Sequence, residues 1–161
     1  MMLHLQPIDS QNVEAILALS VRVEQRGFVA SNTDSIIEAY IAITHNGHAF
    51  PFGIYDGDVP VGFLMIGYGV DDCWQDAPAI ARGNYNLWRL MIDQKYQGRG
   101  YGRAALQLAL DFIRTQPCGP AEWVWLSYEP ENAAARALYH SFGFEETGAW
   151  DGEEVIAARR V

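Results

Sequence analysis

Residues 84–107 read NYNLWRLMIDQKYQGRGYGRAALQ, an apolar strand-like run, a glycine-rich turn and the start of an amphipathic run. Residues 84–93 predict a strand, and the helical spacing of apolar residues predicts a helix over residues 102–116. A helix N-terminus leaves its first N–H groups unpaired and has a partial positive charge. Glycines there remove the Cβ atoms that would keep a phosphate away. The turn therefore predicts a phosphate-binding site.

Three phosphate-binding patterns compete for this turn. The dinucleotide fingerprint G-x-G-x-x-G requires a third glycine where the chain has Arg103, and Glu122 lies at the wrong end of a strand for the ribose-binding acid. A G-x-x-x-x-G-K-[ST] string is absent from the sequence. The pattern Q/R-x-x-G-x-G/A is matched at every specified position by residues 97–102. By itself this match leaves open a turn that only makes a tight connection.

The order of the remaining elements predicts an α/β (α+β) fold. We expect strands at 4–8, 84–93, 121–128, 144–150 and 154–159, and two further strand-like runs within residues 49–69, joined by the DGD of residues 56–58. We expect helices at 10–25, 33–47, 102–116 and 131–143, the second capped by Thr33 or Asp34. The turn around Gly57 indicates a hairpin. The order β-α-α-β-β-β-α-β-α-β-β predicts one domain over residues 1–161, a mixed and mostly antiparallel sheet flanked by helices.

Composition excludes some classes of function. The net charge of −9 disfavours nucleic acid as a partner, because binding to phosphates requires clustered Lys and Arg. It suits a small polycationic partner, although acidity can also serve solubility alone. No apolar run approaches the roughly 20 residues that span a bilayer, and the start has no signal-peptide pattern. Cys73 and Cys118 have no metal-type spacing, so we expect a reduced, cytoplasmic protein without a metal.

A second signal lies on the last predicted helix, where residues 131–144 read ENAAARALYHSFGF. Asn132, Ala135 and Tyr139 recur at spacings of three and four, so one helix face presents an amide, a small residue and a phenol. Together with the strand at 84–93 and the turn, this stretch resembles the GCN5-related N-acetyltransferase (GNAT) superfamily. The resemblance is specific over residues 88–144 and extends by element order to nearly the whole chain.

The resemblance implies acetyl-CoA as cosubstrate. GNAT proteins hold its pyrophosphate on the turn and its pantetheine arm beside the preceding strand, and an amide corresponding to Asn132 bonds the cofactor. The residues implied are Leu90, Met91, Ile92, Gln97, Gly98, Arg99, Gly100, Tyr101, Gly102, Arg103, Asn132 and Tyr139. Arg99 and Arg103 would add charge-assisted contacts to phosphate oxygens.

In many GNAT members a tyrosine at the position of Tyr139 protonates the leaving thiolate. With phenol pKa values near 10 and thiol values near 8.5, Tyr139 stays protonated at neutral pH and can donate without a steep uphill transfer. The alternative is a ring that packs beside Phe142 and Phe144, and His140 is a weaker candidate donor. The backbone N–H of Met91 is a candidate for stabilising the oxyanion. The base is unassigned among Glu24, Glu129, Asp93 and a water relay.

Residues 23–36, VEQRGFVASNTDSI, resemble the corresponding stretch of bacterial diamine and polyamine (spermidine/spermine-type) acetyltransferases. On this reading Glu24 pairs with an ammonium group, Phe28 covers a methylene stem and Asn32 hydrogen-bonds. The alternatives are a surface acid, a core ring and a turn amide. Trp88 is a departure, since it either narrows the acceptor site or faces the core.

The leading hypothesis is an acetyl-CoA-dependent N-acetyltransferase that acts on a small amine, with polyamines first. Two alternatives remain: an enzyme that acetylates a protein N-terminus or lysine, and a non-catalytic acyl-CoA-binding module. A nucleotide-dependent oxidoreductase is a more distant alternative. A homodimer is common among relatives, but no interface is recognisable in the sequence.

Overall fold

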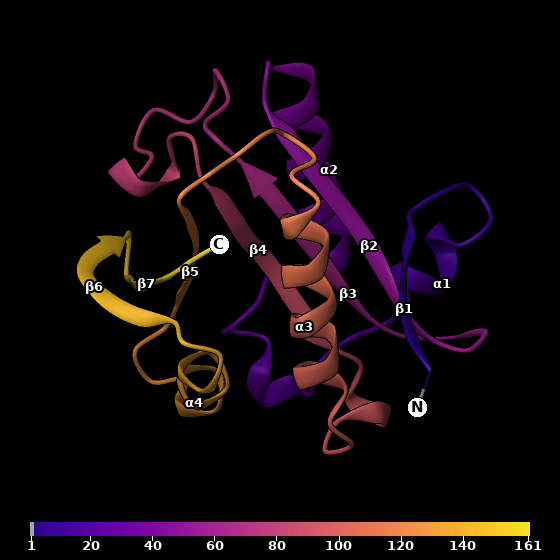
Figure 1. Ribbon diagram of the computed structural model, residues 1–161. Coiled ribbons are helices and arrows are strands. Elements are labelled where there is room, and N and C mark those ends of the chain that lie inside the picture. Colours follow the sequence, from indigo (N-terminus) through magenta and orange to yellow (C-terminus); the bar gives the residue numbers. More distant parts are fainter. Residues whose placement is uncertain (1) are drawn as a thin grey trace.

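Seven strands form one sheet in the order β1-β2-β3-β4-β5-β7-β6 in the computed structural model, which describes residues 2–161 (Figure 1). Only β4 and β5 pair in parallel; every other neighbouring pair is antiparallel. The predicted mixed, mostly antiparallel sheet is therefore confirmed. The strands are β1 (Leu3–Pro7), β2 (His48–Asp56), β3 (Val59–Tyr68), β4 (Tyr85–Ile92), β5 (Trp123–Tyr128), β6 (Glu145–Asp151) and β7 (Glu154–Arg160).

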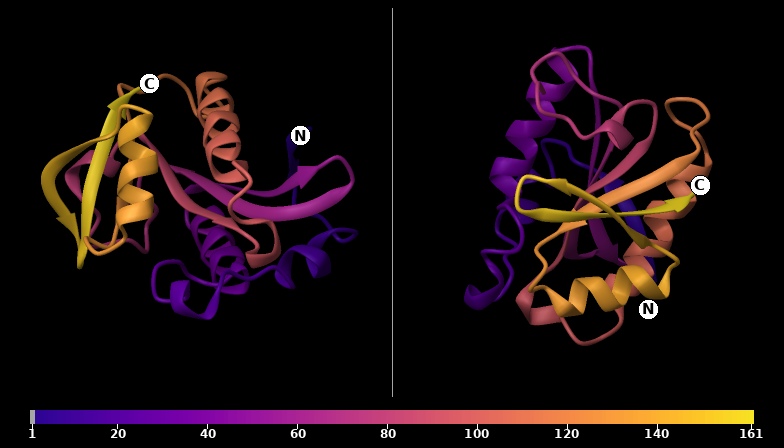
Figure 2. Two further views of the ribbon diagram at one scale, coloured as in Figure 1. Left: turned by 90° about the horizontal axis from the view of Figure 1, so that it is seen from below. Right: turned by 90° about the vertical axis from the view of Figure 1, so that its left-hand side faces the viewer.

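Four α-helices cover the two faces of the sheet, in the predicted element order. Helices α1 (Val13–Leu17) and α2 (Asn32–Thr44) lie on one face, and α3 (Tyr101–Arg114) and α4 (Ala133–Ser141) lie on the other (Figure 2). Three short 3₁₀ turns lie in connecting segments: Val23–Gln25 between α1 and α2, Ala79–Ala81 between β3 and β4, and Gln94–Tyr96 between β4 and α3.

The broad apolar surface of α3 packs on the sheet. Ala105, Leu106, Ala109 and Leu110 are all at most 3% exposed and belong to one cluster with residues of β2, β3 and β5. On the opposite face, α1 and α2 contribute a separate cluster that includes Ile16, Ala39 and Ala42. The sheet thus stands between two cores.

A β-bulge at Trp88 changes which side chains of β4 reach each core. Met65 pairs with Arg89 and the next residue, Ile66, pairs with Leu87, so Trp88 is the extra residue. Before the bulge, Leu87 packs in the cluster beneath α3; after it, Leu90 packs there and Met91 turns to the α2 side. Because side chains alternate along a strand, one inserted residue produces this exchange.

The parallel strands β4 and β5 separate soon after they meet. Only Tyr85 with Val124 and Asn86 with Trp125 are paired, although β4 continues to Ile92 and β5 to Tyr128. Strand edges without a ladder partner present unpaired N–H and C=O groups. The separation therefore opens the middle of the sheet and leaves a free edge on β4.

The first predicted helix is much shorter than expected. The sequence suggested residues 10–25, but α1 ends at Leu17. The backbone N–H of Ser20 donates to Asp93 Oδ1 at 2.9 Å, and the Ser20 carbonyl accepts from the N–H of Gln94 at 2.9 Å. These two bonds hold Ser20 at the end of β4, so its backbone cannot continue the helix.

The cap of α2 also differs from the prediction. Ser31, not Thr33 or Asp34, is the N-cap, and its Oγ accepts from the N–H of Asp34 at 3.1 Å. Ser31 precedes the first helical residue and has an extended backbone, which is the geometry that a cap requires. Thr33 and Asp34 are the second and third residues of the helix itself, so neither can be its N-cap.

Candidate active site

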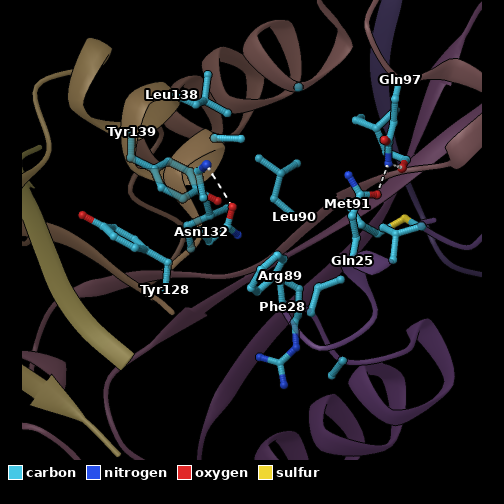
Figure 3. A pocket seen from close by; sticks show the side chains of 18 of the residues that line it. Gln25, Phe28, Arg89, Leu90, Met91, Gln97, Tyr128, Asn132, Leu138 and Tyr139 are labelled. Atoms are coloured by element: carbon cyan, nitrogen blue, oxygen red, sulfur yellow. Dashed lines mark hydrogen bonds between the residues drawn. The ribbon is translucent and has the colours of Figure 1, made fainter. Parts of the chain in front are cut away.

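A cavity of about 610 Å³ opens where β4 and β5 separate. Figure 3 shows Asn132 and Tyr139 on one side of it, Leu90 between, and Gln97 at the other end. Its walls come from β4, the glycine turn, the start of α3, the inner face of α4, and residues 25–30. The structure thus brings the turn, the strand and the helix singled out by the sequence to one cleft.

The glycine turn has the backbone that its sequence requires. Gly98 has φ 79° and Gly100 has φ 83°, a left-handed conformation that residues with a Cβ adopt only at a cost. Gly100 is the N-cap of α3, and no side chain caps this end. Within residues 2–161, no protein group accepts a hydrogen bond from the backbone N–H groups of Gly98 through Arg103. Those donors are free for an anion at the helix N-terminus.

Gln97 connects the turn to the rest of the site. Its Nε2 donates to the carbonyl of Ile92 at 3.0 Å and to Gln25 Oε1 at 2.9 Å. Both side-chain N–H groups are therefore used within the protein. The first residue of the pattern acts here as a brace for the turn.

Three other residues of the turn do not face the cleft as binding groups. Arg99 is exposed and donates to the Lys95 carbonyl, and Arg103 donates to Ser141 Oγ beside a separate surface depression. The ring of Tyr101 is 8% exposed and its hydroxyl donates to Asp56 Oδ2 at 2.5 Å. Tyr101 lines the cleft while its hydroxyl anchors α3 to the β2–β3 hairpin.

The free edge of β4 presents Leu90 and Ile92 rather than Met91. The N–H of Asp93 donates to the carbonyl of Val61 in β3, and the Met91 carbonyl lies against Gly62 of the same strand. Since N–H and C=O groups alternate between the two edges of a strand, those of Met91 point to β3 and those of Leu90 point to the cleft. The oxyanion donor expected at Met91 is thus oriented toward β3, and Leu90 occupies the corresponding position on the open edge.

Asn132 caps α4 with one half of its amide and leaves the other half free. Its Oδ1 accepts from the N–H of Ala135 at 3.2 Å. Within residues 2–161, its Nδ2 has no hydrogen-bond partner, and the residue lines the cleft. The side chain therefore has a donor available at the edge of the cavity.

Tyr139 lies in the cleft with its ring against Tyr128 and Phe144. Burial raises the pKa of Tyr139 to about 12, and the Glu154 carboxylate and the Tyr128 phenol add to the rise. The phenol stays protonated over the whole physiological range, as expected. The gap to a thiol pKa near 8.5 is wider than the sequence suggested, so full transfer to sulfur is more steeply uphill.

Glu154, the first residue of β7, is a site residue that the sequence did not reveal. It lines the cleft, and its Oε1 accepts from Ser127 Oγ at 3.0 Å. Burial raises the pKa of the Glu154 carboxyl, with Glu129 and Asp151 adding and Ser127 and Arg89 opposing. The only sequence signal is a carboxylate after the tight turn at Gly152, a common pattern in exposed hairpins.

Of the three residues predicted to bind the acceptor, Glu24, Phe28 and Asn32, only Phe28 lines the cleft. Phe28 lines the cleft with 41% of its surface exposed. Glu24 is exposed and does not line it. Asn32 is 4% exposed and its Nδ2 donates to the carbonyl of Ile16 at 2.9 Å, which ties α2 to α1. Neither Glu24 nor Asn32 is in position to meet a molecule in the cleft.

The other proton-transfer candidates also lie off the cleft. Asp93 is 4% exposed and accepts from the N–H groups of Ser20 and Lys95. His140 is exposed, and neither it nor Glu129 lines the cavity. Trp88, in contrast, does line it, at the bulge of β4.

Residues 2–161 contain neither a membrane-spanning helix nor a recognisable metal site. No helix there is long and apolar enough to cross a membrane. No group of three or more His, Cys, Asp or Glu residues in that range is placed to hold a metal ion.

Known proteins are similar to this chain in sequence and in fold. Residues 14–144 match the family model described as acetyltransferase (GNAT) family. The spermine/spermidine N(1)-acetyltransferase of Bacillus subtilis (strain 168) is 29% identical, with 97% of each chain covered. The [ribosomal protein bS18]-alanine N-acetyltransferase of Salmonella typhimurium is 32% identical, covering 73% of this chain and 79% of its own.

Solved structures show the same fold at low sequence identity. The aminoglycoside acetyltransferase AAC(6')-Ib in complex with coenzyme A superposes with a TM-score of 0.76 at 13% identity, covering 98% of this chain and 94% of that one. The PaiA N-acetyltransferase of Thermoplasma acidophilum, also in complex with coenzyme A, gives 0.68 at 14% identity over the whole of both chains. With the family model matched over most of its length, this chain belongs to the GNAT acetyltransferase family and is an N-acetyltransferase.

Proposed function

We propose that this protein transfers the acetyl group of acetyl-CoA to a primary amine of a small polycationic acceptor. Diamines and polyamines are the leading candidates for this acceptor. The observation that carries the proposal is that one cleft contains free N–H groups at residues 98–103, an open β4 edge and the half-buried phenol of Tyr139. Each feature corresponds to one part of an acetyl-CoA reaction.

The turn and the strand edge bind the cosubstrate. The left-handed glycines and the unpaired N–H groups of Gly98–Arg103 suit the pyrophosphate, which meets the positive end of α3. The Leu90 and Ile92 edge suits the amide groups of the pantetheine arm, in the manner of an added strand. The Nδ2 of Asn132 is a further donor at the α4 side of the cleft.

Two donors act on the reacting atoms. The N–H of Leu90 stabilises the oxyanion that forms when the amine attacks the thioester. Tyr139 donates its proton to the sulfur as the C–S bond breaks. Because the pKa of Tyr139 is about 12, the phenol keeps its proton until negative charge develops on the sulfur. The proton is therefore not transferred before the C–S bond begins to break.

The acceptor class rests on relatives and on charge. A relative at 29% identity over nearly the whole chain carries the name spermine/spermidine N(1)-acetyltransferase. The net charge of −9 favours the approach of polycations. A peptide N-terminus is the second candidate, because another relative is named for an alanine of ribosomal protein bS18. For location we propose the cytoplasm, since Cys73 and Cys118 are unpaired thiols.

The test is a panel of acceptors with purified protein and acetyl-CoA, monitored by release of CoA thiol. The panel contains spermidine, spermine, putrescine, an aminoglycoside, free amino acids, a lysine peptide and a peptide with an N-terminal alanine. The proposal expects the highest kcat/KM with a polyamine. A preference for either peptide would reassign the acceptor, and acetyl-CoA binding without thiol release in any reaction would support a non-catalytic binding module.

A further inference from the structure

A second cavity, of about 490 Å³, lies on the α2 side of the sheet. This size falls within the range of roughly 300–1,000 Å³ that is usual for small-molecule sites. Three tryptophans line it: Trp74 from the β3–β4 loop, Trp88 from the bulge of β4 and Trp125 from β5. We call it the tryptophan cavity.

The two cavities meet between β4 and β5. Leu87, Trp88, Arg89, Ser127 and Glu154 line both of them. These residues stand where the parallel ladder ends, so the gap in the sheet connects the acetyl-CoA cleft with the tryptophan cavity. Of the five, Glu154 is the only carboxylate.

We propose that Glu154 is the general base that takes a proton from the acceptor amine, and that the acceptor reaches it through the tryptophan cavity. The inference rests on the proposed function, since it concerns the same reaction. It adds the residue that the sequence left unassigned and the route by which a cation arrives.

The lining of the tryptophan cavity suits an extended cation. Glu38, Asp71, Asp151 and Glu154 face it, against the single guanidinium of Arg89, which is paired with Glu38 at 2.7 Å. No three of these acids lie close enough together to hold a metal ion. Glu38 is paired with Arg89, so the three other carboxylates leave a net negative charge in the cavity, which suits a diamine or polyamine.

The tryptophans supply the surface for the chain between those charges. Trp74 and Trp125 stack at 6.2 Å between ring centroids, and indole faces bind both methylene groups and ammonium ions. Trp125 is 1% exposed, and its Nε1–H has no hydrogen-bond partner in residues 2–161. Trp125 therefore contributes an apolar ring to the wall of the cavity and no acceptor for the ammonium groups.

The position of Glu154 suits proton transfer. Asp151 lies opposite it in the β6–β7 hairpin, and Ser127 Oγ holds one of its oxygens at 3.0 Å. The other charged groups acting on it are Glu129 and Arg89. A carboxylate whose pKa is raised by burial is a stronger base than an exposed one.

The proposed step balances as follows. The ammonium nitrogen gives one proton to the Glu154 carboxylate, which later releases it to solvent. The nitrogen lone pair forms the C–N bond, the C–S bond breaks, and the sulfur leaves with the proton of Tyr139. After the C–N bond forms, the nitrogen loses a second proton, which goes to the Tyr139 oxygen. Both side chains therefore end in the protonation states in which they began.

Glu154 and Tyr139 are also coupled by charge. The Glu154 carboxylate contributes to the high pKa of Tyr139. When Glu154 becomes neutral by accepting the amine proton, this contribution is lost and the pKa of the phenol falls. Proton uptake on one side of the gap thereby makes the acid on the other side more ready to donate.

The test compares Glu154→Gln with the wild type, using spermidine, acetyl-CoA and thiol release between pH 5 and pH 9. Glu153→Gln, an exposed neighbour outside both cavities, is the matched control. We expect Glu154→Gln to lower kcat by about 100-fold or more, with acetyl-CoA affinity within twofold of the wild type. Glu153→Gln should leave kcat unchanged.

Two further variants separate a base from a structural residue. Ser127→Ala removes a bond that lowers the pKa of Glu154, so the acid limb of kcat/KM should move to higher pH. Asp151→Asn removes a like charge that raises this pKa, so the limb should move to lower pH. Misfolding would not produce opposite shifts.

The outcomes are distinguishable. If the wild type acetylates spermidine and Glu154→Gln retains its kcat, or if neither variant moves the acid limb, the assignment of Glu154 is wrong while the proposed function stands. If the wild type turns over peptides instead of amines, the route for a polycation is wrong. If no acceptor is turned over, the proposed function and this inference fail together.

Discussion

Gln97 and Gln25, 72 residues apart in the chain, are joined by a hydrogen bond of 2.9 Å from the Nε2 of the first to the Oε1 of the second. The bond connects the glycine turn with the segment that carries Phe28, and both line the cleft. The two halves of the site are thus linked directly, and the first residue of the pattern provides the link.

Replacing Gln97 by Ala should weaken both stability and acetyl-CoA binding. The carbonyl of Ile92 and the Oε1 of Gln25 lose a donor, which typically costs about 1–2 kcal/mol in the free energy of unfolding. Urea denaturation and calorimetric titration with CoA would measure the two effects. Gln94→Ala, an exposed amide just before the turn, is the control. Unchanged stability of Gln97→Ala would show that the residue does not brace the turn.

Gly102→Val should reduce CoA affinity without unfolding the domain. Gly102 lies inside the first turn of α3 and lines the cleft, and a Cβ there would approach only Leu138, at 3.9 Å. Gly100 is a poorer choice, because its φ of 83° would strain any other residue. We expect CoA affinity to fall at least tenfold, with the melting temperature close to that of the control Asp111→Val on the exposed face of α3. Unaltered affinity would contradict the assignment of this turn to the pyrophosphate.

Tyr139→Phe should lower kcat by about 100-fold while acetyl-CoA affinity changes little. The ring contacts with Tyr128 and Phe144 remain, and only the proton donor is lost. Tyr68→Phe, on a tyrosine outside the cleft, is the control. With a pKa of about 12, the wild-type phenol is protonated below that pH, so Tyr139 should cause no loss of kcat up to pH 10. Parallel losses of kcat and affinity in Tyr139→Phe would indicate a packing role instead.

Trp88→Ala should relax the choice of acceptor. Trp88 stands where the two cavities meet, and its ring packs so near Gly67 of β3 that a Cβ there would lie 3.3 Å from it. We expect kcat/KM for an aminoglycoside or a lysine peptide to rise relative to spermidine, with about 2–3 kcal/mol of stability lost. Trp150→Ala, on the exposed strand β6, is the control. An unchanged ratio would show that Trp88 does not narrow the path.

Ionic strength should distinguish charged acceptors. Four carboxylates line the tryptophan cavity, so a dication is drawn in more strongly than a monocation of equal length. Raising the salt concentration from 20 to 300 mM should lower kcat/KM several-fold for putrescine and much less for butylamine. The reason is that the Debye length, over which charges attract one another, shortens to a few ångströms. Equal responses of the two amines would remove the electrostatic argument for a polycation.

The elements of the fold were predictable where the pattern was local. The period of two at 48–68, the wide apolar stripe of α3 and the glycines of the turn each follow from contacts within a few residues. The family pattern at Gln97–Gly102 and the phenol at Tyr139 are local in the same sense, and the structure brings them to one cleft.

Other features depend on residues far apart in sequence. α1 stops early because Asp93 and Gln94 bind the backbone of Ser20, and Asn32 is buried because its amide meets the carbonyl of Ile16. Neither partner can be read from the helix itself.

The sequence by itself determined the local parts of the proposed acetyl-CoA site: the glycine turn, the strand before it and a phenol one helix later. Only the tertiary structure decided the acceptor side. The bulge at Trp88 and the parting of β4 from β5 open the gap, and the β6–β7 hairpin brings Glu154 to it. The physical reason is that a glycine turn needs only its own backbone geometry to present N–H groups. A desolvated carboxylate acquires its basicity from distant neighbours that only the folded chain brings together.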